Sequence, residues 1–104
     1  MVLEDTQYGE NDMTLLDAVR GIHELNQAAT IYAREPWTAG SDALVEIEPD
    51  EGGLPADVAA QGLSYFIEVS IGRDFLDDWA ASMSSIPTLS ERCKRLIQYV
   101  INDA

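Results

Sequence analysis

The residues best suited to chemistry in this sequence are one histidine, one cysteine and several carboxylates. His23 could act as a general base only with a nucleophile or a substrate proton within hydrogen-bond reach. It flanks the apolar stripe of the first expected helix, and such positions are commonly at the helix surface or its boundary, so we expect that placement. Cys93 lies between Arg92 and Lys94, whose charges would make a thiol nucleophilic. The apolar period of this segment places Cys93 on the buried face of a helix instead, so we expect an inert thiol.

Two groups of carboxylates have residue types that suit catalysis or metal binding. Glu46 and Glu68, beside Arg34, resemble an acid–base pair, but such chemistry needs a set separation within a cleft. A short open sheet offers little cleft, so we expect a cross-strand ion pair with Arg34. The acidic segment 48–51 precedes two glycines but lacks the spacing of calcium ligands. We expect a solvated acidic turn there, and no metal or cofactor.

Hydrophobic periodicity predicts the elements that position these side chains. Thr14 with Asp17, and Thr88 with Glu91, are capping patterns that precede the first and the last helix. The expected helices cover residues 14–26, 73–83 and 88 onwards, the expected strands cover 30–35, 42–48 and 63–71, and a short turn lies at 56–60. This order, αβββαα, predicts an α+β fold: a three-stranded antiparallel sheet with helices packed on one face.

Strand alternation divides the side chains of the predicted sheet between two faces. Ile31, Val45 and Ile67 are expected to face the helices, so their neighbours should point away. The candidate interaction surface on this outer side comprises Tyr32, Arg34, Trp37, Leu44, Glu46, Phe66 and Glu68. Two interpretations are open. In the first interpretation, the surface contacts another protein. In the second, its aromatic residues form a second core with Trp37, the 49–62 loop or a helix. The small number of helices favours the contact surface.

Composition bounds the class of protein. The 104 residues include 19 acidic and 6 basic side chains, a net charge of −13, and 46% are hydrophobic. Nucleic acids and anionic membranes attract clustered Lys and Arg, so neither partner is expected. With one cysteine, no signal segment and no apolar span, we expect a cytoplasmic protein. Residues 1–12 carry four acids and no base and are expected to form a flexible acidic tail, with 13–104 as a single domain.

Three segments together carry a resemblance to a known family. They are ATIYAREPW at residues 29–37, YFIEVSIGRDFLDDW at 65–79 and PTLSERCKRLIQYVINDA at 87–104. These segments resemble a family of small acidic bacterial proteins of unassigned function, and the resemblance covers most of residues 14–104. It implies a bacterial, cytosolic protein and carries over no catalytic residue.

Three functions are compatible with these observations. The favoured one is a non-enzymatic, acidic protein-binding module, immunity- or antitoxin-like or regulatory, whose charge steers it onto a basic partner. The second is a small ligand-binding domain or enzyme with a site around Tyr32, Trp37 and Glu68, closed by the 49–62 loop. The third is a structural homodimer joined through the outer sheet face or an edge strand.

Overall fold

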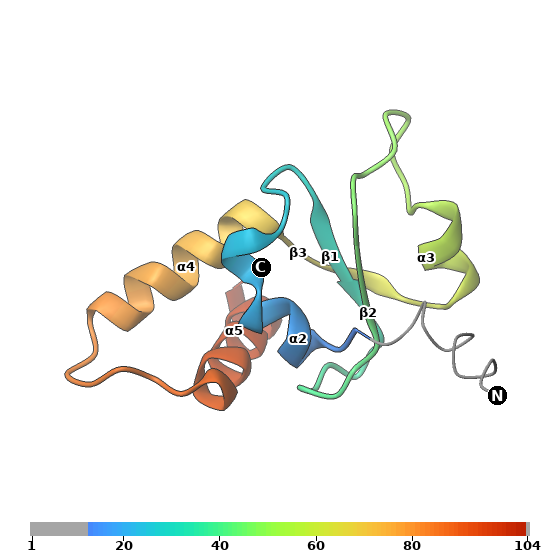
Figure 1. Ribbon diagram of the computed structural model, residues 1–104. Coiled ribbons are helices and arrows are strands. Elements are labelled where there is room, and N and C mark those ends of the chain that lie inside the picture. The colour runs from blue at the N-terminus through green and yellow to red at the C-terminus, as the bar shows by residue number, and fades with distance from the viewer. Residues whose placement is uncertain (1–12, 104) are drawn as a thin grey trace, which may run out of the picture.

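The computed structural model describes residues 13–103, so the predicted acidic tail lies outside the described residues. In chain order, the elements are α2 (Leu15–Arg20), the 3-10 turn η2 (Ile22–Glu24), β1 (Thr30–Ala33), β2 (Ala43–Glu46), α3 (Ala56–Ala60), β3 (Ser64–Glu68), α4 (Val69–Ala81) and α5 (Leu89–Asp103). The strands form one antiparallel sheet in the order β2-β1-β3. Helices α2, α4 and α5 lie on one side of this sheet and α3 lies on the other (Figure 1). The predicted α+β class, antiparallel sheet and element order are confirmed, with short helices added.

Local hydrogen bonds begin the first and last of these helices as predicted. The Thr14 hydroxyl accepts from the amide of Asp17 at 3.2 Å, and the Asp17 carboxylate accepts from the amide of Thr14 at 3.0 Å. Thr88 and Glu91 make the same reciprocal pair, at 3.1 and 2.8 Å, ahead of α5. Each pair satisfies amides that a helix start leaves without a partner. Gly21 caps the end of α2, and beyond it the predicted first helix continues only as η2.

The boundary between β3 and α4 differs from the prediction. The strand expected to reach Ile71 ends at Glu68, and the helix expected from residue 73 already begins at Val69. Val69 and Gly72 are buried three residues apart, whereas Ile71 is 44% exposed. The apolar residues of this segment fit the two-residue period of a strand and also the first turn of a helix. The sequence pattern therefore does not distinguish the two, and packing against the core favours the helix.

Gly72 allows α4 to approach the sheet and η2 closely. A β-carbon at this position would lie 3.3 Å from Cγ2 of Ile67 and 3.4 Å from Cδ1 of Ile22. Both separations are shorter than the optimal distance between two non-bonded carbons. A larger residue at position 72 must therefore displace α4 or its neighbours.

A β-bulge in β3 changes the face to which Phe66 points. Ile31 pairs with Ile67, but the next β1 residue, Tyr32, pairs with Tyr65. Phe66 is therefore an extra residue in β3 that has no paired residue on β1. Phe66 therefore turns into the core on the helical side, where its ring meets Trp37 edge-on with centroids 5.0 Å apart. The prediction that Phe66 lies on the outer face beside Tyr32 is wrong for this reason.

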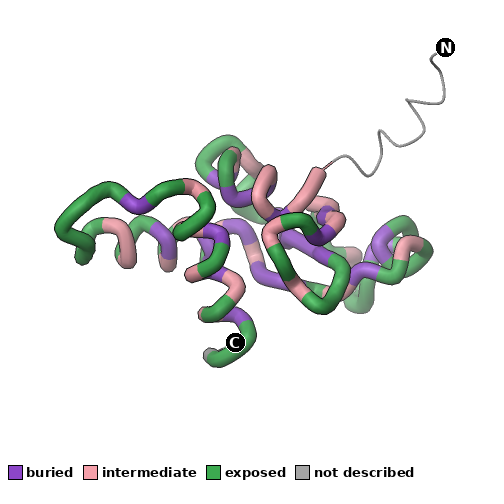
Figure 2. Tube along the Cα trace, turned by 90° about the horizontal axis from the view of Figure 1, so that it is seen from below, coloured by how far each residue is buried: buried purple, intermediate pink, exposed green. Residues whose placement is uncertain are grey.

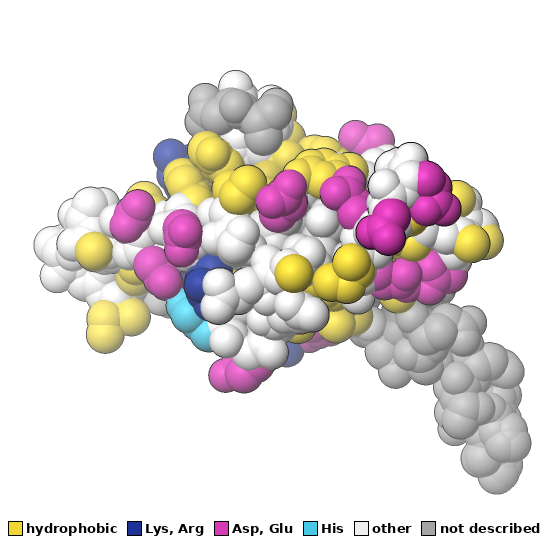
Figure 3. Space-filling model, turned by 90° about the horizontal axis from the view of Figure 1, so that it is seen from above, with side chains coloured by type: hydrophobic (Ala, Val, Ile, Leu, Met, Phe, Trp, Pro, Cys, Tyr) yellow, Lys and Arg dark blue, Asp and Glu magenta, His cyan; other side chains and the backbone are white. Residues whose placement is uncertain are grey.

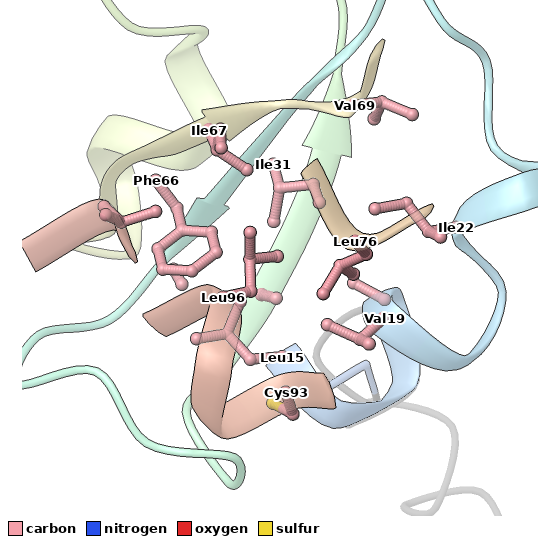
Figure 4. Close-up of a cluster of buried hydrophobic side chains, with 14 of the residues drawn as sticks. Leu15, Val19, Ile22, Ile31, Phe66, Ile67, Val69, Leu76, Cys93 and Leu96 are labelled. Carbon is pink, nitrogen blue, oxygen red and sulfur yellow. The ribbon is translucent and has the colours of Figure 1, made fainter. Parts of the chain in front are cut away.

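Two hydrophobic cores lie on opposite sides of the sheet. The main core joins the inner sheet face to α2, α4 and α5, and its buried side chains include Leu15, Val19, Ile22, Ile31, Phe66, Ile67, Val69, Leu76, Cys93 and Leu96 (Figure 4). A smaller core lies under α3, where Val58 and Leu63 pack on Tyr32 with Leu44 beside them. Buried positions gather where these layers meet, while residues 81–86, between α4 and α5, are exposed (Figure 2). Tyr32 is thus covered by the segment between β2 and β3.

Candidate functional site

Carboxylates concentrate on the side of the molecule that carries β2 and α3 (Figure 3). We define the acidic face as Glu46, Glu48, Asp50, Glu51, Asp57 and Glu68. Four of these side chains are exposed, and Glu46 and Glu68 are half-buried. Residues 35–72 contain no Lys or Arg, so no positive side chain from the same stretch of chain offsets this charge. Strand pairing places Glu46 and Glu68 on either side of Thr30, at one end of the sheet.

A pair of carboxyl groups joins β2 to α3 within the acidic face. The side chains of Glu46 and Asp57 hydrogen-bond to one another, and this bond, together with burial and the Asp57 charge, raises the pKa of Glu46 to about 7. Two carboxyl groups can share a hydrogen bond only when one of them holds a proton. Asp57 is held in place from its own helix, because its Oδ1 accepts from the amide of Val58 at 3.0 Å. The pair therefore keeps a shared proton to a higher pH than an isolated glutamate would.

Two tyrosines lie on the same side of the sheet as Glu46. Tyr32 is fully buried, and its hydroxyl has no hydrogen-bond partner among residues 13–103. Burial and the charges of Glu48 and Glu46 raise the pKa of Tyr32. Tyr65 meets the Tyr32 ring edge-on, with centroids 6.3 Å apart, and is 42% exposed. Burial and the charges of Glu68 and Glu48 raise the pKa of Tyr65, so a partly exposed aromatic ring lies near these two carboxylates.

Arg34 does not pair with the carboxylates of the acidic face. Its Nη2 lies 3.3 Å from Oδ2 of Asp42, and its Nη1 donates to the backbone carbonyl of Gln61 at 2.9 Å. The predicted cross-strand ion pair with Glu46 and Glu68 is therefore wrong, because Arg34 lies past the last β1 residue and reaches the turn after α3. Arg34 fastens that turn to the start of β2.

Trp37 lies on the helical side, away from Tyr32. Its Nε1 donates to the carbonyl of Ala33 at 3.2 Å, and its ring lines a cavity of about 370 Å³ with Lys94 and Ile97 of α5. A second hollow of about 310 Å³ adjoins it, shares Lys94 and is lined by Trp79 of α4. Lys94 and Gln98 of α5 line both hollows. Of the candidate ligand-site residues, Tyr32 and Glu68 thus belong to one side of the sheet and Trp37 to the other.

The remaining chemically active side chains are engaged elsewhere. Cys93 is buried in the main core, and burial raises the pKa of its thiol. Nε2 of His23 lies 2.9 Å from Oδ1 of Asp77, and both side chains are about half exposed. Within the described residues, no three His, Cys, Asp or Glu side chains gather in a way that could hold a metal ion.

Sequence reasoning found Glu46 and Tyr32 but missed Asp57. Asp57 is eleven positions from Glu46 in a segment expected to be mostly loop, so no spacing rule connects the two carboxyl groups. The only available signal was its place in the first turn of a short helix, where an acidic residue is favoured.

No protein-family model, curated protein or solved structure matches the chain. In the part of the chain that the structure describes, no helix is long and apolar enough to cross a membrane. The acidic face and the two hollows beside α5 are the features from which a function can be inferred.

Proposed function

We propose that the protein is a non-enzymatic binding module whose acidic face contacts a basic protein partner. The observation that supports this proposal is the concentration of six carboxylates over β2, α3 and the end of β3, in a stretch of chain without Lys or Arg. Such a single-sign surface raises the rate of encounter with an oppositely charged protein and disfavours acidic ones. The exposed carboxylates lie beside Tyr65, a residue type that is frequent at binding interfaces.

A partner with a basic, anion-binding site is the class of target that this surface fits. Occupying such a site would block it, so inhibition of the immunity or antitoxin type is the finer form of the proposal. A regulatory contact with a basic protein is the other form. Bacterial origin and a cytoplasmic location stay predictions.

Charge reversal on the acidic face tests the proposal. The triple variant E48K/D50K/E51K changes exposed side chains that make no hydrogen bond or ion pair within residues 13–103. The matched control E24K/D74K/D78K changes the net charge equally but alters exposed carboxylates of η2 and α4. Affinity capture from the source organism at 0.15 M salt, read by mass spectrometry, should retain a basic protein on wild type and on the control but not on the acidic-face variant. Equal retention by all three would overturn the proposal.

Binding of a small ligand is a second candidate, favoured by the cavity beside Trp37. Its volume of about 370 Å³ lies within the range of small-molecule sites. Lys94 supplies a cation, and Trp37 and Ile97 supply apolar contact, so an apolar anion is the matching class. A panel of aromatic carboxylates that raises the melting temperature of wild type but not of K94A would support this function. The homodimer alternative is tested by light scattering after size exclusion.

A further inference from the structure

Two hollows beside α5 lie on the side of the sheet away from α3. Each is lined by one of the two tryptophans of the chain: Trp37 lines the first, of about 370 Å³, and Trp79 lines the second, of about 310 Å³. Lys94 and Gln98 line both hollows and are four residues apart, about one turn of α5. These two side chains therefore form a ridge between the hollows.

The other lining residues of α5 show that the hollows flank this ridge. Ser90 and Ile97 line only the first hollow. Glu91 and Arg95 line only the second. With 3.6 residues per turn, these two pairs lie on opposite flanks of the ridge that Lys94 begins. The hollows are therefore separated by no more than the diameter of one helix, about 10–12 Å with its side chains.

The ridge presents polar groups that have no partner within residues 13–103. Lys94 and Gln98 are exposed, and neither side chain makes a hydrogen bond or an ion pair in this part of the chain. An ammonium group donates to a carboxylate, and a side-chain amide offers a donor and an acceptor to a peptide group. Arg95 adds a second cation, held 5.0 Å from the centroid of the Phe75 ring. These side chains match a ligand that combines a carboxylate with a peptide group.

The charges around the hollows favour an acidic ligand. Lys94 and Arg95 are cations, and Glu91 is the one carboxylate among the lining residues. The Glu91 carboxylate accepts from the amide of Thr88 at 2.8 Å, so it is held at the start of α5. The acidic face lies on the other side of the sheet, and at 0.15 M salt exposed charges more than about 8 Å apart are largely screened. A carboxylate beside Lys94 is therefore attracted, although the net charge of the chain is −13.

Apolar surface near the second hollow favours a protein ligand over a small molecule. Met83, which lines this hollow, is 41% exposed. Ile86, three residues later in the segment that joins α4 to α5, is 93% exposed. Exposed apolar side chains that gather on one surface are typical of protein contact sites. A small molecule in the first hollow alone would leave both side chains in water.

We propose that the two hollows form a docking site for an extended acidic peptide of a partner protein, with one apolar side chain in each hollow and a carboxylate on Lys94. In an extended chain, residues i, i+2 and i+4 point to the same face, and residues i and i+4 are about 13 Å apart. This span is comparable to the helix diameter that separates the hollows, and it places the middle residue over the ridge. The peptide therefore has the pattern apolar-x-acidic-x-apolar, and its backbone bonds to the amide of Gln98. This site goes beyond the proposed function, because it does not use the acidic face.

The two tryptophans allow the occupation of each hollow to be measured separately. The probe is the blocked peptide acetyl-Gly-Phe-Ser-Glu-Ser-Leu-Gly-amide, titrated to millimolar concentration into the nitrogen-labelled full chain at 0.15 M salt. NMR spectra should show the indole N–H signals of Trp37 and Trp79 shifting together, with one apparent Kd. Either W37F or W79F is enough to assign the two signals. The matched peptide with glutamine in place of glutamate should bind at least about fivefold more weakly, because it has no charge to place on Lys94.

Substitutions on α5 complete the test. K94A should bind the glutamate peptide at least about fivefold more weakly than wild type and should no longer distinguish it from the glutamine peptide. Q98A should bind about twofold more weakly or worse, because it loses the amide on the ridge. R92A is the matched control: it removes a cation of the same helix that lines neither hollow, and it should bind as wild type does. Circular dichroism verifies that each variant is folded.

Several results would overturn the docking site. Equal binding by K94A and R92A, or no indole shift at millimolar peptide, would do so directly. A shift of one indole signal alone, or binding of phenylacetate as tight as that of the peptide, would assign one hollow to a small ligand. Self-association of the free protein that is lost in K94A would assign the hollows to a second copy of the chain. Peptide binding only after deletion of residues 1–12 would assign them to that segment. The proposed function fails separately, if the E48K/D50K/E51K variant keeps the partner of the wild-type protein.

Discussion

Replacing Glu46 by glutamine tests the shared proton through folding stability alone. Hydrogen bonding to Asp57, burial and the Asp57 charge raise the pKa of Glu46 from 4.5 to about 7. Between these pH values the folded state binds more protons than the unfolded chain, so stability falls as pH rises. The stabilising contribution of this group is therefore complete below about pH 4.5 and is lost as the pH passes through about 7.

The raised pKa sets the size of this effect. Each pKa unit corresponds to about 1.4 kcal/mol, which gives an upper limit of roughly 3 kcal/mol for the interval from 4.5 to about 7. Water reaches the half-buried Glu46, and the screening reduces the expected value to about 1–2 kcal/mol. Glutamine still offers a hydrogen bond to Asp57 and carries no charge at any pH. E46Q should therefore match wild type near pH 5 and be more stable than wild type by about 1–2 kcal/mol at pH 8.

Urea unfolding followed by circular dichroism at pH 5, 6, 7 and 8 measures this difference. E48Q is the matched control, because Glu48 is exposed on the same face and lies outside the pair, and it should keep the pH dependence of wild type. An NMR titration of the side-chain carboxyl carbons provides an independent measurement of the pKa. A stability difference between E46Q and wild type that stays constant from pH 5 to pH 8 would refute the shared proton.

Four further substitutions or reactions test other parts of the structure. Y32F removes a buried hydroxyl without a partner and should raise the unfolding free energy by about 1 kcal/mol; an unchanged melting temperature would contradict this. G72A should lower it by about 1–3 kcal/mol, because the new methyl group meets Ile67 at 3.3 Å; a neutral result in urea unfolding would show that α4 shifts freely. Cys93 should not react with an aromatic disulfide reagent under native conditions, since burial raises the pKa of its thiol. F66E should lower the free energy of unfolding by about 4 kcal/mol, because it buries an unpaired charge in the main core. A folded F66E variant with wild-type stability would show that Phe66 lies on the outer face of the sheet.

Features set by neighbouring residues could be predicted from the sequence. The reciprocal Thr14–Asp17 hydrogen bonds need only three residues of separation, so the pattern alone locates the start of the helix. The side of the sheet to which Ile31 and Ile67 point could also be predicted. Side chains alternate between the two faces of a regular strand, so the position of one buried residue determines the face of the others. Both predictions are confirmed because no distant part of the chain decides them.

Features that depend on distant contacts could not be predicted in this way. The bulge at Phe66 inserts one residue into β3, and alternation has no means to detect it. Asp57 lies near Glu46 because the 49–62 segment folds back over Tyr32. The composition of that segment predicts turns, but it does not predict which part of the sheet the segment packs against. The candidate surface was therefore found on the correct strands but with the wrong partner for Glu46 and with Phe66 on the wrong side.

The contact between α2 and α5 has a consequence for how the chain acquires its structure during synthesis. Leu15 and Val19 of α2 bury their side chains in the core that Cys93 and Leu96 of α5 complete, although 68 residues lie between these helices. The apolar stripe of α2 therefore has no final partner until α5 has left the ribosomal exit tunnel. Pairings between such distant segments form late and leave apolar surface exposed in the meantime. The domain should thus fold after release of α5 rather than progressively during translation, and nascent chains that stop before residue 89 should be bound by chaperones.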